Sequence, residues 1–324
     1  MHKTCWRGCL KKLISQTVDR RSEKNGKVKV KVQAQLFGIT RQALHKRKKK
    51  VQKKNSDKEQ ICCMAKTVRK YLPRTGTRKI HDITRHYLNE RGIFVGRDRF
   101  FKILREEQLL VRRRKRHFFT TDSKHLFRKY PNKAKDLVVT QPEQLWVSDI
   151  TYLKTRAGNL YLSLITDAFS RKIMGYHVAD HLKATGPIEA LKMALKNRMY
   201  PKRKLMHHSD KGIQYCCDAY VKVLNENKIK ISMTSQYDPY ENAKAERVNG
   251  TIKNEFQLDE VMPDIAFVKR EINKTVEVYN SLRPHLSCHM KTPEQMHVNP
   301  NPYPIKLKTN PLWETIFLNN FSSN

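Results

Sequence analysis

The sequence predicts an α/β fold in which a mixed five-stranded sheet is flanked by helices and preceded by all-α helix-turn-helix segments. Two observations support this prediction. Residues 1–140 carry apolar residues at helical spacing, whereas short β-type runs begin after Gln144 and later alternate with helical segments. The charge changes at the same place. Residues 1–140 hold 41 basic and 11 acidic side chains, a net +30 of the total +36, which leaves +6 for residues 141–324.

The first candidate helix-turn-helix lies in residues 30–48. Small and apolar residues stand on both sides of a turn glycine at the spacing of this motif: Ala34, Phe37, Gly38, Ile39 and Leu44. An ordinary helical hairpin is the alternative. The Lys-rich residues 46–60 then predict a linker or an exposed helix end. We therefore assign residues 1–60 to a basic N-terminal helical region.

A second helix-turn-helix-like, DNA-binding region is expected in residues 61–116. Helices are predicted over residues 57–72, before Pro73, over residues 77–91 and over residues 97–107. The apolar face of the last helix should bury four residues: Phe100, Phe101, Ile103 and Leu104. Arg97 and Arg99 begin this helix, where a recognition helix contacts DNA, although solvated surface charges are the alternative.

The densest run of charge follows this region. It consists of five consecutive basic residues: Arg112, Arg113, Arg114, Lys115 and Arg116. Such a run binds phosphate groups without sequence specificity and in a salt-sensitive way. Residues 117–140 are polar and irregular, and they predict a basic linker that follows a DNA backbone. A basic disordered tail, or a ribosome-type protein, is the alternative interpretation of the whole N-terminal part.

The remaining elements follow from period-two and helical patterns in residues 141–300. Strands are expected at residues 145–153, 160–165, 172–178, 204–208 and 230–233. Helices are expected at residues 184–197, 218–227, 242–256 and 266–282. Three antiparallel strands followed by alternating helices and strands give the order of a ribonuclease-H-like fold. The turn-rich sequence beyond Pro293 predicts a loose C-terminal tail over residues 301–324.

Three acidic residues carry the candidate chemistry. Asp149 lies in the first predicted strand, Asp210 directly follows the short fourth strand, and Glu246 lies one turn into a helix. Carboxylates that converge can hold two divalent cations about 3.5–4 Å apart, an arrangement that drives in-line attack on a phosphodiester. Mg²⁺ prefers such oxygen ligands. We therefore expect Asp149, Asp210 and Glu246 to be both catalytic and metal-binding residues, whereas surface charges are the ordinary alternative for any one of them.

The helix that carries Glu246 gives a further candidate. Lys253 follows seven residues later, nearly two full turns, so it shares a face with Glu246, as do Asn249 and Gly250. A cation beside a metal ligand suits a DNA phosphate lying along this face. Lys253 is therefore a predicted DNA contact.

Cysteine content and hydropathy exclude several classes of protein. The seven cysteines include two adjacent pairs and fit neither a disulfide framework nor a zinc module. A metal site at His207-His208 and Cys216-Cys217 lacks ligand-type spacing. The N-terminus has no apolar stretch of signal-peptide length, and no apolar run reaches membrane-spanning length. A protein of the cytoplasm with reduced thiols is expected.

These residues together resemble a known family. The chain is similar to bacterial insertion-sequence transposases of the DDE integrase-core type, whose catalytic subunit comes from a second reading frame and resembles retroviral integrase. The matching motifs are Trp146-Val-Ser-Asp149, Gly158-Asn-Leu-Tyr161 with Asp167-Ala-Phe-Ser170-Arg171, His208-Ser-Asp210-Lys-Gly, Asn242-Ala-Lys-Ala-Glu246 with Lys253, and Tyr279-Asn-Ser-Leu-Arg283-Pro-His285. The group often has Asp at the position of Glu241 and aromatic residues at the positions of Arg247-Val-Asn249.

The resemblance implies an activity and partners. It implies Mg²⁺-dependent nicking at the 3′ ends of an element and strand transfer into target DNA, with Mn²⁺ as a substitute metal. It also implies binding to terminal inverted repeats, a homo-oligomeric synaptic complex, and an upstream-frame helix-turn-helix partner or fusion. The expected location is the bacterial cytoplasm, at the nucleoid, with no membrane association. The alternatives are a catalytically silent DNA-binding repressor and a nuclease without transfer activity.

Overall fold

The computed structural model describes residues 30–36, 38–111, 127–235, 243–301 and 310–321. The chain divides into two compact units, residues Met1–Cys63 and Met64–Asn324. The run from Arg112 to Arg116, a predicted DNA contact, lies outside the described residues. Among the helices that are described, none combines the length and apolar character needed to cross a membrane.

The first unit contains the predicted turn between two helices. Helix α2 (Val30–Leu36) leads through Gly38 into α3 (Arg41–Tyr71). Gly38 has φ +59°, a backbone conformation that glycine adopts without a steric penalty. The Ile39 amide donates to the Ala34 carbonyl oxygen at 3.0 Å, and buried Ala34 and Leu44 pack with Ile39. Two helices joined by a glycine turn are therefore present, as both the helix-turn-helix and the helical-hairpin interpretations expect.

Helix α3 continues without a break through residues 46–60. The expectation of a linker there was wrong, and the alternative of an exposed helix is correct. Lys and Gln are good helix formers, and almost all side chains of this stretch are exposed, so its charges stay in water. The helix ends at Tyr71, two residues before Pro73, because a proline disfavours helical geometry in the residue before it.

In the second unit, two helices follow α3 along the chain. They are α4 (Thr77–Glu90) and α5 (Arg97–Glu106), and each follows a glycine. Phe100 and Leu104 bury one face of α5, as predicted. Phe101 does not: its ring is partly exposed. One residue is a rotation of about 100° around a helix, so Phe101 is turned away from the face that its neighbour buries.

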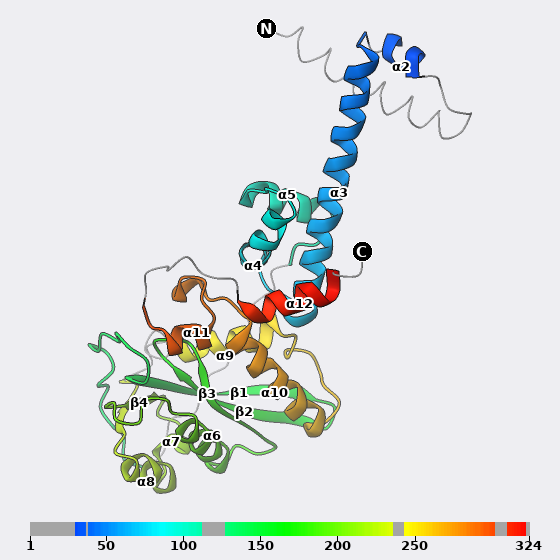
Figure 1. Ribbon diagram of the computed structural model, residues 1–324. Helices are drawn as coiled ribbons and strands as arrows, with labels where there is room; N and C mark the ends of the chain where they lie inside the picture. Colours follow the sequence, from blue (N-terminus) through cyan, green and yellow to red (C-terminus); the bar gives the residue numbers. More distant parts are fainter. Residues whose placement is uncertain (1–29, 37, 112–126, 236–242, 302–309, 322–324) are drawn as a thin grey trace, which may run out of the picture. The chain divides into compact units, whose positions relative to one another are not determined.

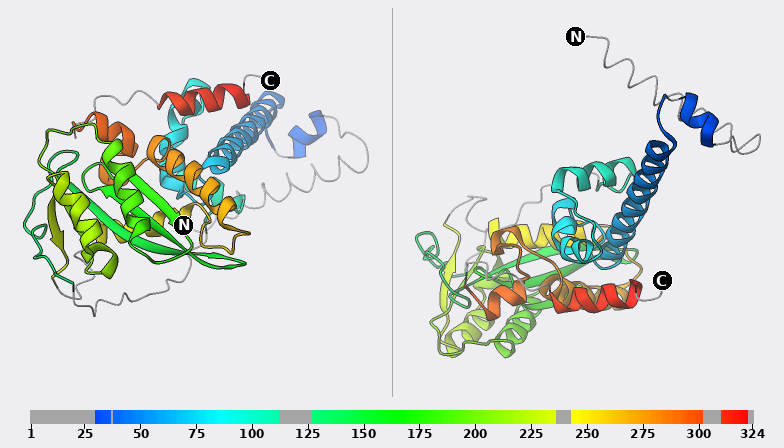
Figure 2. Two further views of the ribbon diagram at one scale, coloured as in Figure 1. Left: turned by 90° about the horizontal axis from the view of Figure 1, so that it is seen from below. Right: turned by 45° about the horizontal axis from the view of Figure 1, so that its top comes forward.

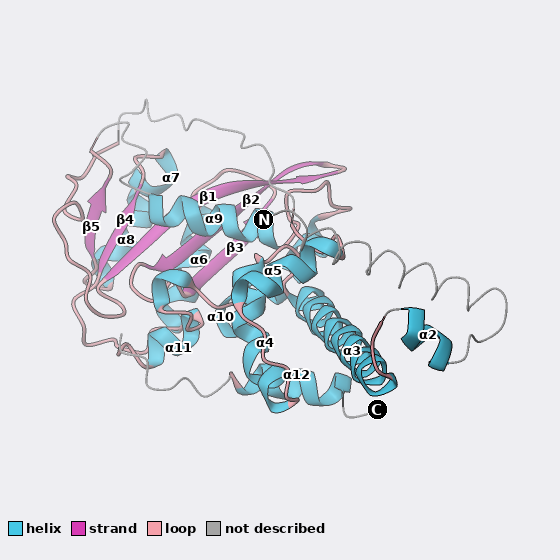
Figure 3. Ribbon diagram, turned by 90° about the horizontal axis from the view of Figure 1, so that it is seen from above, coloured by secondary structure: helices cyan, strands magenta, loops and turns pink. Residues whose placement is uncertain are grey.

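The centre of the second unit is a mixed five-stranded sheet, as the sequence predicts. Its strands are β1 (Leu145–Thr155), β2 (Gly158–Asp167), β3 (Ile173–Ala179), β4 (Met206–Ser209) and β5 (Lys230–Met233). They lie in the order β3-β2-β1-β4-β5, with β3 and β5 at the two edges (Figure 3). The pairs β1–β2 and β2–β3 are antiparallel, whereas β1–β4 and β4–β5 are parallel. This is a ribonuclease-H-like topology.

Helices cover both faces of the sheet (Figures 1 and 2). One face carries α6 (Thr185–Lys196), α7 (Ile213–Cys216) and α8 (Asp218–Glu226), packed around the fully buried Trp146. The other face carries α9 (Ala243–Glu255) and α10 (Ile265–Ser281), packed around Leu153. Because side chains alternate along a strand, Leu145 and Val147 lie on the face opposite to Trp146, where they pack against Ala245 of α9.

The C-terminal part is folded, against the prediction of a loose tail from residue 301. After a 3₁₀ turn (Leu286–Cys288) come α11 (Pro293–Val298) and α12 (Pro311–Phe321). Trp313 and Phe317 of α12 are buried, and the Trp313 indole N–H donates to the Leu282 carbonyl oxygen at 3.0 Å. Both helices begin at a proline, which is favourable at the first helical position although it disrupts a helix interior.

The end of the predicted linker also packs on the core. Ala134, Leu137 and Val139 lie against the cluster around Leu145, and the Ala134 amide donates to the Ser232 hydroxyl oxygen at 3.1 Å. Residues 127–140 therefore contact the sheet through these side chains. Residues 117–126 lie outside the described residues.

Candidate active site

Asp149 and Asp210 are brought level by the pairing of two parallel strands. In the register of β1 with β4, Val147 lies opposite His208. The same offset continued by two residues places Asp149 opposite Asp210, just past the end of β4. Asp149 shares the face of Val147, since residues two apart along a strand share a face, and on that face Val147 packs against Ala245 of α9.

A tight turn holds the Asp210 carboxylate. The Gly212 amide donates to Asp210 Oδ1 at 3.0 Å. A β-carbon at Gly212 would lie 3.0 Å from the same oxygen, so the turn has no room for a side chain without displacing the carboxylate. The Asp-Lys-Gly sequence thus fixes Asp210 through a short local contact.

The third carboxylate comes from the first turn of α9. Glu246 is exposed, and Asn249, one turn later on the same helix, is buried. The Asn249 amide donates from Nδ2 to Asp149 Oδ2 at 2.7 Å. This bond ties the helix that carries Glu246 to the strand that carries Asp149. The sequence placed Asn249 on the face of Glu246 but did not reveal this contact.

The pKa of the Asp149 carboxyl group is raised by its surroundings. Burial, followed by the negative charge of Asp210, raises the pKa of Asp149 to about 7, with a smaller contribution from Glu246. Hydrogen bonds from Asn249 and the Ile150 amide act in the opposite direction. Burial also raises the pKa of Glu246. A carboxylate whose pKa is raised by neighbouring negative charge belongs to a site that a bound cation would stabilise.

Lys253 lies on the same side of the sheet. Its ammonium donates to the Thr151 hydroxyl oxygen at 3.3 Å, two residues along β1 from Asp149. Burial lowers the pKa of Lys253, and the charge of Asp149 is among the smaller influences that raise it. The structure therefore places a partly buried cation near Asp149.

The donor chemistry of this site fits a divalent cation. Three carboxylates offer the oxygen ligands that Mg²⁺ prefers, and their mutual repulsion is the force that a cation would relieve. Within the described ranges, no group of three or more His, Cys, Asp or Glu side chains lies close enough to enclose a metal ion. The carboxylates are thus suited to a metal by their chemistry, without forming a closed cage.

Polar residues around the site have structural roles. His207 is buried between Ser148 and Tyr220, whose hydroxyl oxygens lie 2.7 and 2.9 Å from its Nε2. Burial lowers the pKa of His207 to about 3, so the ring is neutral. Asp167 accepts hydrogen bonds from the amide and hydroxyl of Ser170, both at 2.7 Å. The Ser148–His207 contact joins β1 to β4 next to Asp149, and the Asp167–Ser170 bonds close the turn after β2.

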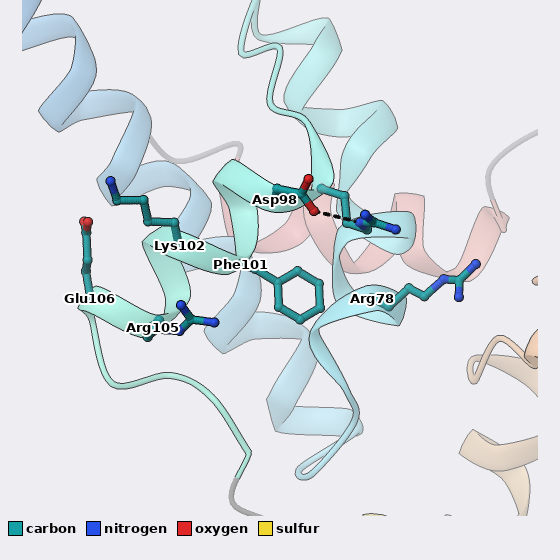
Figure 4. Close-up of a pocket in the computed structure, with 7 residues that line it drawn as sticks. Arg78, Asp98, Phe101, Lys102, Arg105 and Glu106 are labelled. Carbon is teal, nitrogen blue, oxygen red and sulfur yellow. Dashed lines mark hydrogen bonds and ion pairs between the residues drawn. The ribbon is translucent and has the colours of Figure 1, made fainter.

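Arg97, one of the two predicted DNA contacts on α5, lines a separate hollow of about 750 Å³ (Figure 4). Its lining comes wholly from α4 and α5: Arg78, Arg97, Asp98, Phe101, Lys102, Arg105 and Glu106. Figure 4 shows the Phe101 ring between the side chains of Arg105 and Arg78. The Arg97 guanidinium donates to the Asp98 carboxylate at 2.9 Å, and Arg99 is exposed in the same helical turn. The sequence did not indicate that Phe101 belongs to this surface.

Comparison with known proteins identifies the sheet domain. Two integrase core domain families match residues 139–239 and 227–293. The insertion element IS600 uncharacterized 31 kDa protein of Shigella sonnei is 36% identical over 181 residues, which are 56% of this chain and 65% of that protein. Transposase InsF for insertion sequence IS3A of Escherichia coli is 34% identical over 167 residues, 50% of this chain and 56% of the relative.

A solved structure gives a weaker likeness. The HTLV-2 integrase catalytic core domain in complex with magnesium is 23% identical and has a TM-score of 0.39, covering 48% of this chain and 97% of that one. The chain spans less than two thirds of the length of the two curated relatives. Residues 139–293 are an integrase core domain of the kind carried by bacterial insertion-sequence transposases of the DDE integrase type.

Proposed function

We propose that the chain is a Mg²⁺-dependent transposase that nicks the 3′ ends of an insertion-sequence element and transfers the freed hydroxyl to target DNA. The observation that carries this proposal is the register of β1 with β4, whose offset brings Asp149 level with Asp210 just past the end of β4, with the Glu246 helix joined to Asp149 through Asn249. The similarity to insertion-sequence transposases supports the choice of DNA as substrate.

The residues of the site have distinct roles in this proposal. Asp149, Asp210 and Glu246 would hold Mg²⁺, with Mn²⁺ as a substitute. When bound, such ions activate the attacking water or hydroxyl and stabilise the leaving oxygen. Asn249 keeps the Asp149 carboxylate in one orientation. Lys253 offers its ammonium to a phosphate of the DNA strand beside the carboxylates.

Binding to DNA is assigned to the basic helical part. The hollow on α4 and α5 combines four basic side chains with an accessible aromatic ring, a set that suits a DNA strand with its phosphates and base or sugar faces. Arg97 belongs to this surface, and Arg99 is exposed in the same helical turn. The run from Arg112 to Arg116 would add contacts that depend on charge alone. The proposed DNA partners are the terminal inverted repeats of the element and the target duplex.

Further partners follow from the same proposal. Joining two ends requires at least two active sites, so a homo-oligomeric synaptic complex is proposed. An upstream-frame protein with its own helix-turn-helix, separate or fused, is the second proposed partner. The proposed place of action is the nucleoid in the bacterial cytoplasm.

The test is a nicking and joining assay on the ends of the element. Wild-type protein is compared with the Asp149→Asn variant, in Mg²⁺ and in chelator, with and without the product of the upstream frame. We expect nicked and joined products that need both Mg²⁺ and Asp149. The variant should fold and bind the ends, because the amide has nearly the shape of the carboxylate but is a poor ligand for Mg²⁺.

The outcomes separate the alternatives. End binding with no cut under any condition, even with the upstream product, would identify a DNA-binding repressor. Released fragments without joined product would identify a nuclease that lacks transfer activity. Cutting by Asp149→Asn at the wild-type rate would contradict the assignment of the site.

A further inference from the structure

The opposite end of helix α9 carries a second buried cluster of charge. Glu255 is the last residue of α9, and its carboxylate accepts hydrogen bonds from two cations. Arg283 donates from Nε at 2.8 Å and from an Nη at 2.7 Å, while Lys79 donates to both carboxylate oxygens at 3.0 and 3.3 Å. The two-pronged contact with Arg283 fixes the plane of the carboxylate.

The two cations come from different parts of the second unit. Arg283 follows α10 within the integrase core, whereas Lys79 lies in the first turn of α4, the helix that lines the basic hollow. Arg74, just before α4, adds to the same junction: its amide donates to the Glu255 carbonyl oxygen at 2.9 Å, and its guanidinium pairs with Asp259 at 2.9 Å. Glu255 is thus the point at which α4 meets α9.

Two neighbouring residues of α4 contact different surfaces. Arg78 lines the hollow on α4 and α5, whereas Lys79, the next residue, contacts Glu255. On α9 the arrangement is similar, since Glu255 follows Lys253 by two residues and Asn249 by six. The basic hollow is therefore connected to Asn249, which holds Asp149, through the Lys79–Glu255 contact and helix α9.

The cluster is shielded from water. The side chains of Arg283 and Lys79 are only 4% and 11% exposed. Burial and the charge of Arg283 lower the pKa of Lys79 to about 8, while Glu255 raises it. Buried ion pairs contribute little to net stability compared with apolar packing, but they define geometry, and removal of one partner leaves the other uncompensated.

We propose that the Lys79–Glu255 contact is a positioning device that sets where DNA bound at the α4–α5 hollow is cut by the carboxylates. The inference rests on the proposed transposase function. Lys79 and Glu255 are positioning residues in this proposal, because they act through α4 and α9 and touch no reacting atom. The contact transmits the position of the DNA-binding helices to the helix that carries Glu246.

The test uses variants of the full chain that separate this contact from its neighbours. Lys79→Gln removes the side-chain contact between α4 and Glu255 of α9 but leaves the Arg283–Glu255 pair and the contacts of Arg74. Lys79→Arg keeps the charge and serves as the conservative variant. Lys192→Gln removes an exposed charge on α6 and serves as the matched control. Thermal unfolding checks that each variant is folded.

Three quantities are measured for each variant. The first is affinity for a labelled element end, and the second is the rate and position of the nick at single-nucleotide resolution in Mg²⁺. The third is amide hydrogen exchange over residues 243–255 with and without end DNA. The exchange measurement does not depend on catalysis, so it tests the coupling even in the absence of any cut.

We expect Lys79→Gln to bind ends with an affinity within about twofold of wild type, since Arg78 and the hollow are intact. We expect it to nick at least about tenfold more slowly and at several neighbouring phosphates, because small displacements of the reacting groups cost orders of magnitude in rate. DNA should slow exchange in α9 of the wild type and of Lys79→Arg, and have no such effect in Lys79→Gln. Lys192→Gln should match the wild type.

Two results would overturn the inference. One is wild-type nick position, nick rate and DNA-dependent protection in Lys79→Gln. The other is a loss of nicking that follows a loss of end binding in proportion, which would make Lys79 a DNA contact only. If wild-type protein cuts no DNA, the proposed function fails, and the exchange comparison alone decides whether the helices are coupled.

Discussion

At the scale of single residues, Asp149 is the best-supported member of the site because two donors from different elements hold its carboxylate. The Ile150 amide donates to Oδ1 at 3.0 Å, and the Asn249 side chain donates to Oδ2 at 2.7 Å. The other end of the Asn249 amide, Oδ1, is buried and has no hydrogen-bond partner within the described residues. Asn249 is therefore held in place chiefly by its contact with Asp149 and by packing.

Replacement of Asn249 should test this support. We expect Asn249→Ala to fold and to lower Mg²⁺-dependent nicking by about 10–100-fold, since loss of a residue that orients a metal ligand typically has this effect on metal affinity or activity. The measurement is a titration of nicking rate with Mg²⁺, in which the half-saturating concentration should rise. Asn254→Ala is the control, because Asn254 is exposed on the same helix and donates to the Gly250 carbonyl oxygen of its own helix. Equal titration curves for wild type and Asn249→Ala would contradict the role.

At the scale of elements, the sheet depends on a close approach between β3 and α6. A β-carbon on Gly175 would lie 2.1 Å from the Ala190 carbonyl oxygen and 2.6 Å from the Ala194 amide nitrogen. Glycine at this position, with the fully buried Ala190 and Ala194 opposite, lets the helix backbone lie directly on the strand. This packing supports the edge of the sheet on the side away from β4.

Gly175→Ala should therefore destabilise the protein strongly. The extra carbon meets backbone atoms, which cannot move aside as a flexible side chain can, and overpacking of a core typically costs about 1–3 kcal/mol and occasionally more. The measurement is the midpoint and slope of chemical unfolding for wild type and variant. Gly186→Ala on α6 is the control, since its β-carbon would make an ordinary contact of 3.5 Å with the Ser163 hydroxyl. Equal midpoints for all three proteins would show that α6 adjusts freely.

Periodicity explains how far the elements could be predicted from the sequence. Each strand of the sheet was expected within a few residues of its observed bounds, because alternation along a strand is a local pattern. The level alignment of Asp149 with Asp210 could not be predicted, since the register of parallel strands depends on tertiary packing. Helix α12 was missed because the turn-rich sequence beyond Pro293 predicts a loose tail, whereas the burial of Trp313 and Phe317 stabilises the helix.

At the scale of the whole molecule, charge is separated along the chain. Residues 1–140 hold +30 of the net charge of +36, and the integrase core is nearly balanced. Such a distribution favours a division of work in which the helical part attracts DNA and the core carries the chemistry. The balanced core also limits non-specific attraction of DNA to faces of the sheet domain that take no part in the reaction.

The salt dependence of end binding should reveal which charges take part. Binding of a cationic surface to duplex DNA weakens with salt, and each phosphate contact contributes a slope of about −0.9 to the plot of log affinity against log salt. We expect Arg105→Gln, in the α4–α5 hollow, to make this slope shallower by about one such contact. Lys222→Gln is the matched control, because Lys222 is an exposed charge on α8 of the core. The measurement is end binding over a series of salt concentrations. An unchanged slope in Arg105→Gln, or an equally large change of slope in Lys222→Gln, would place the DNA contacts on another surface. The reason is that counterion release depends on the number of phosphates that the protein neutralises and not on its total charge.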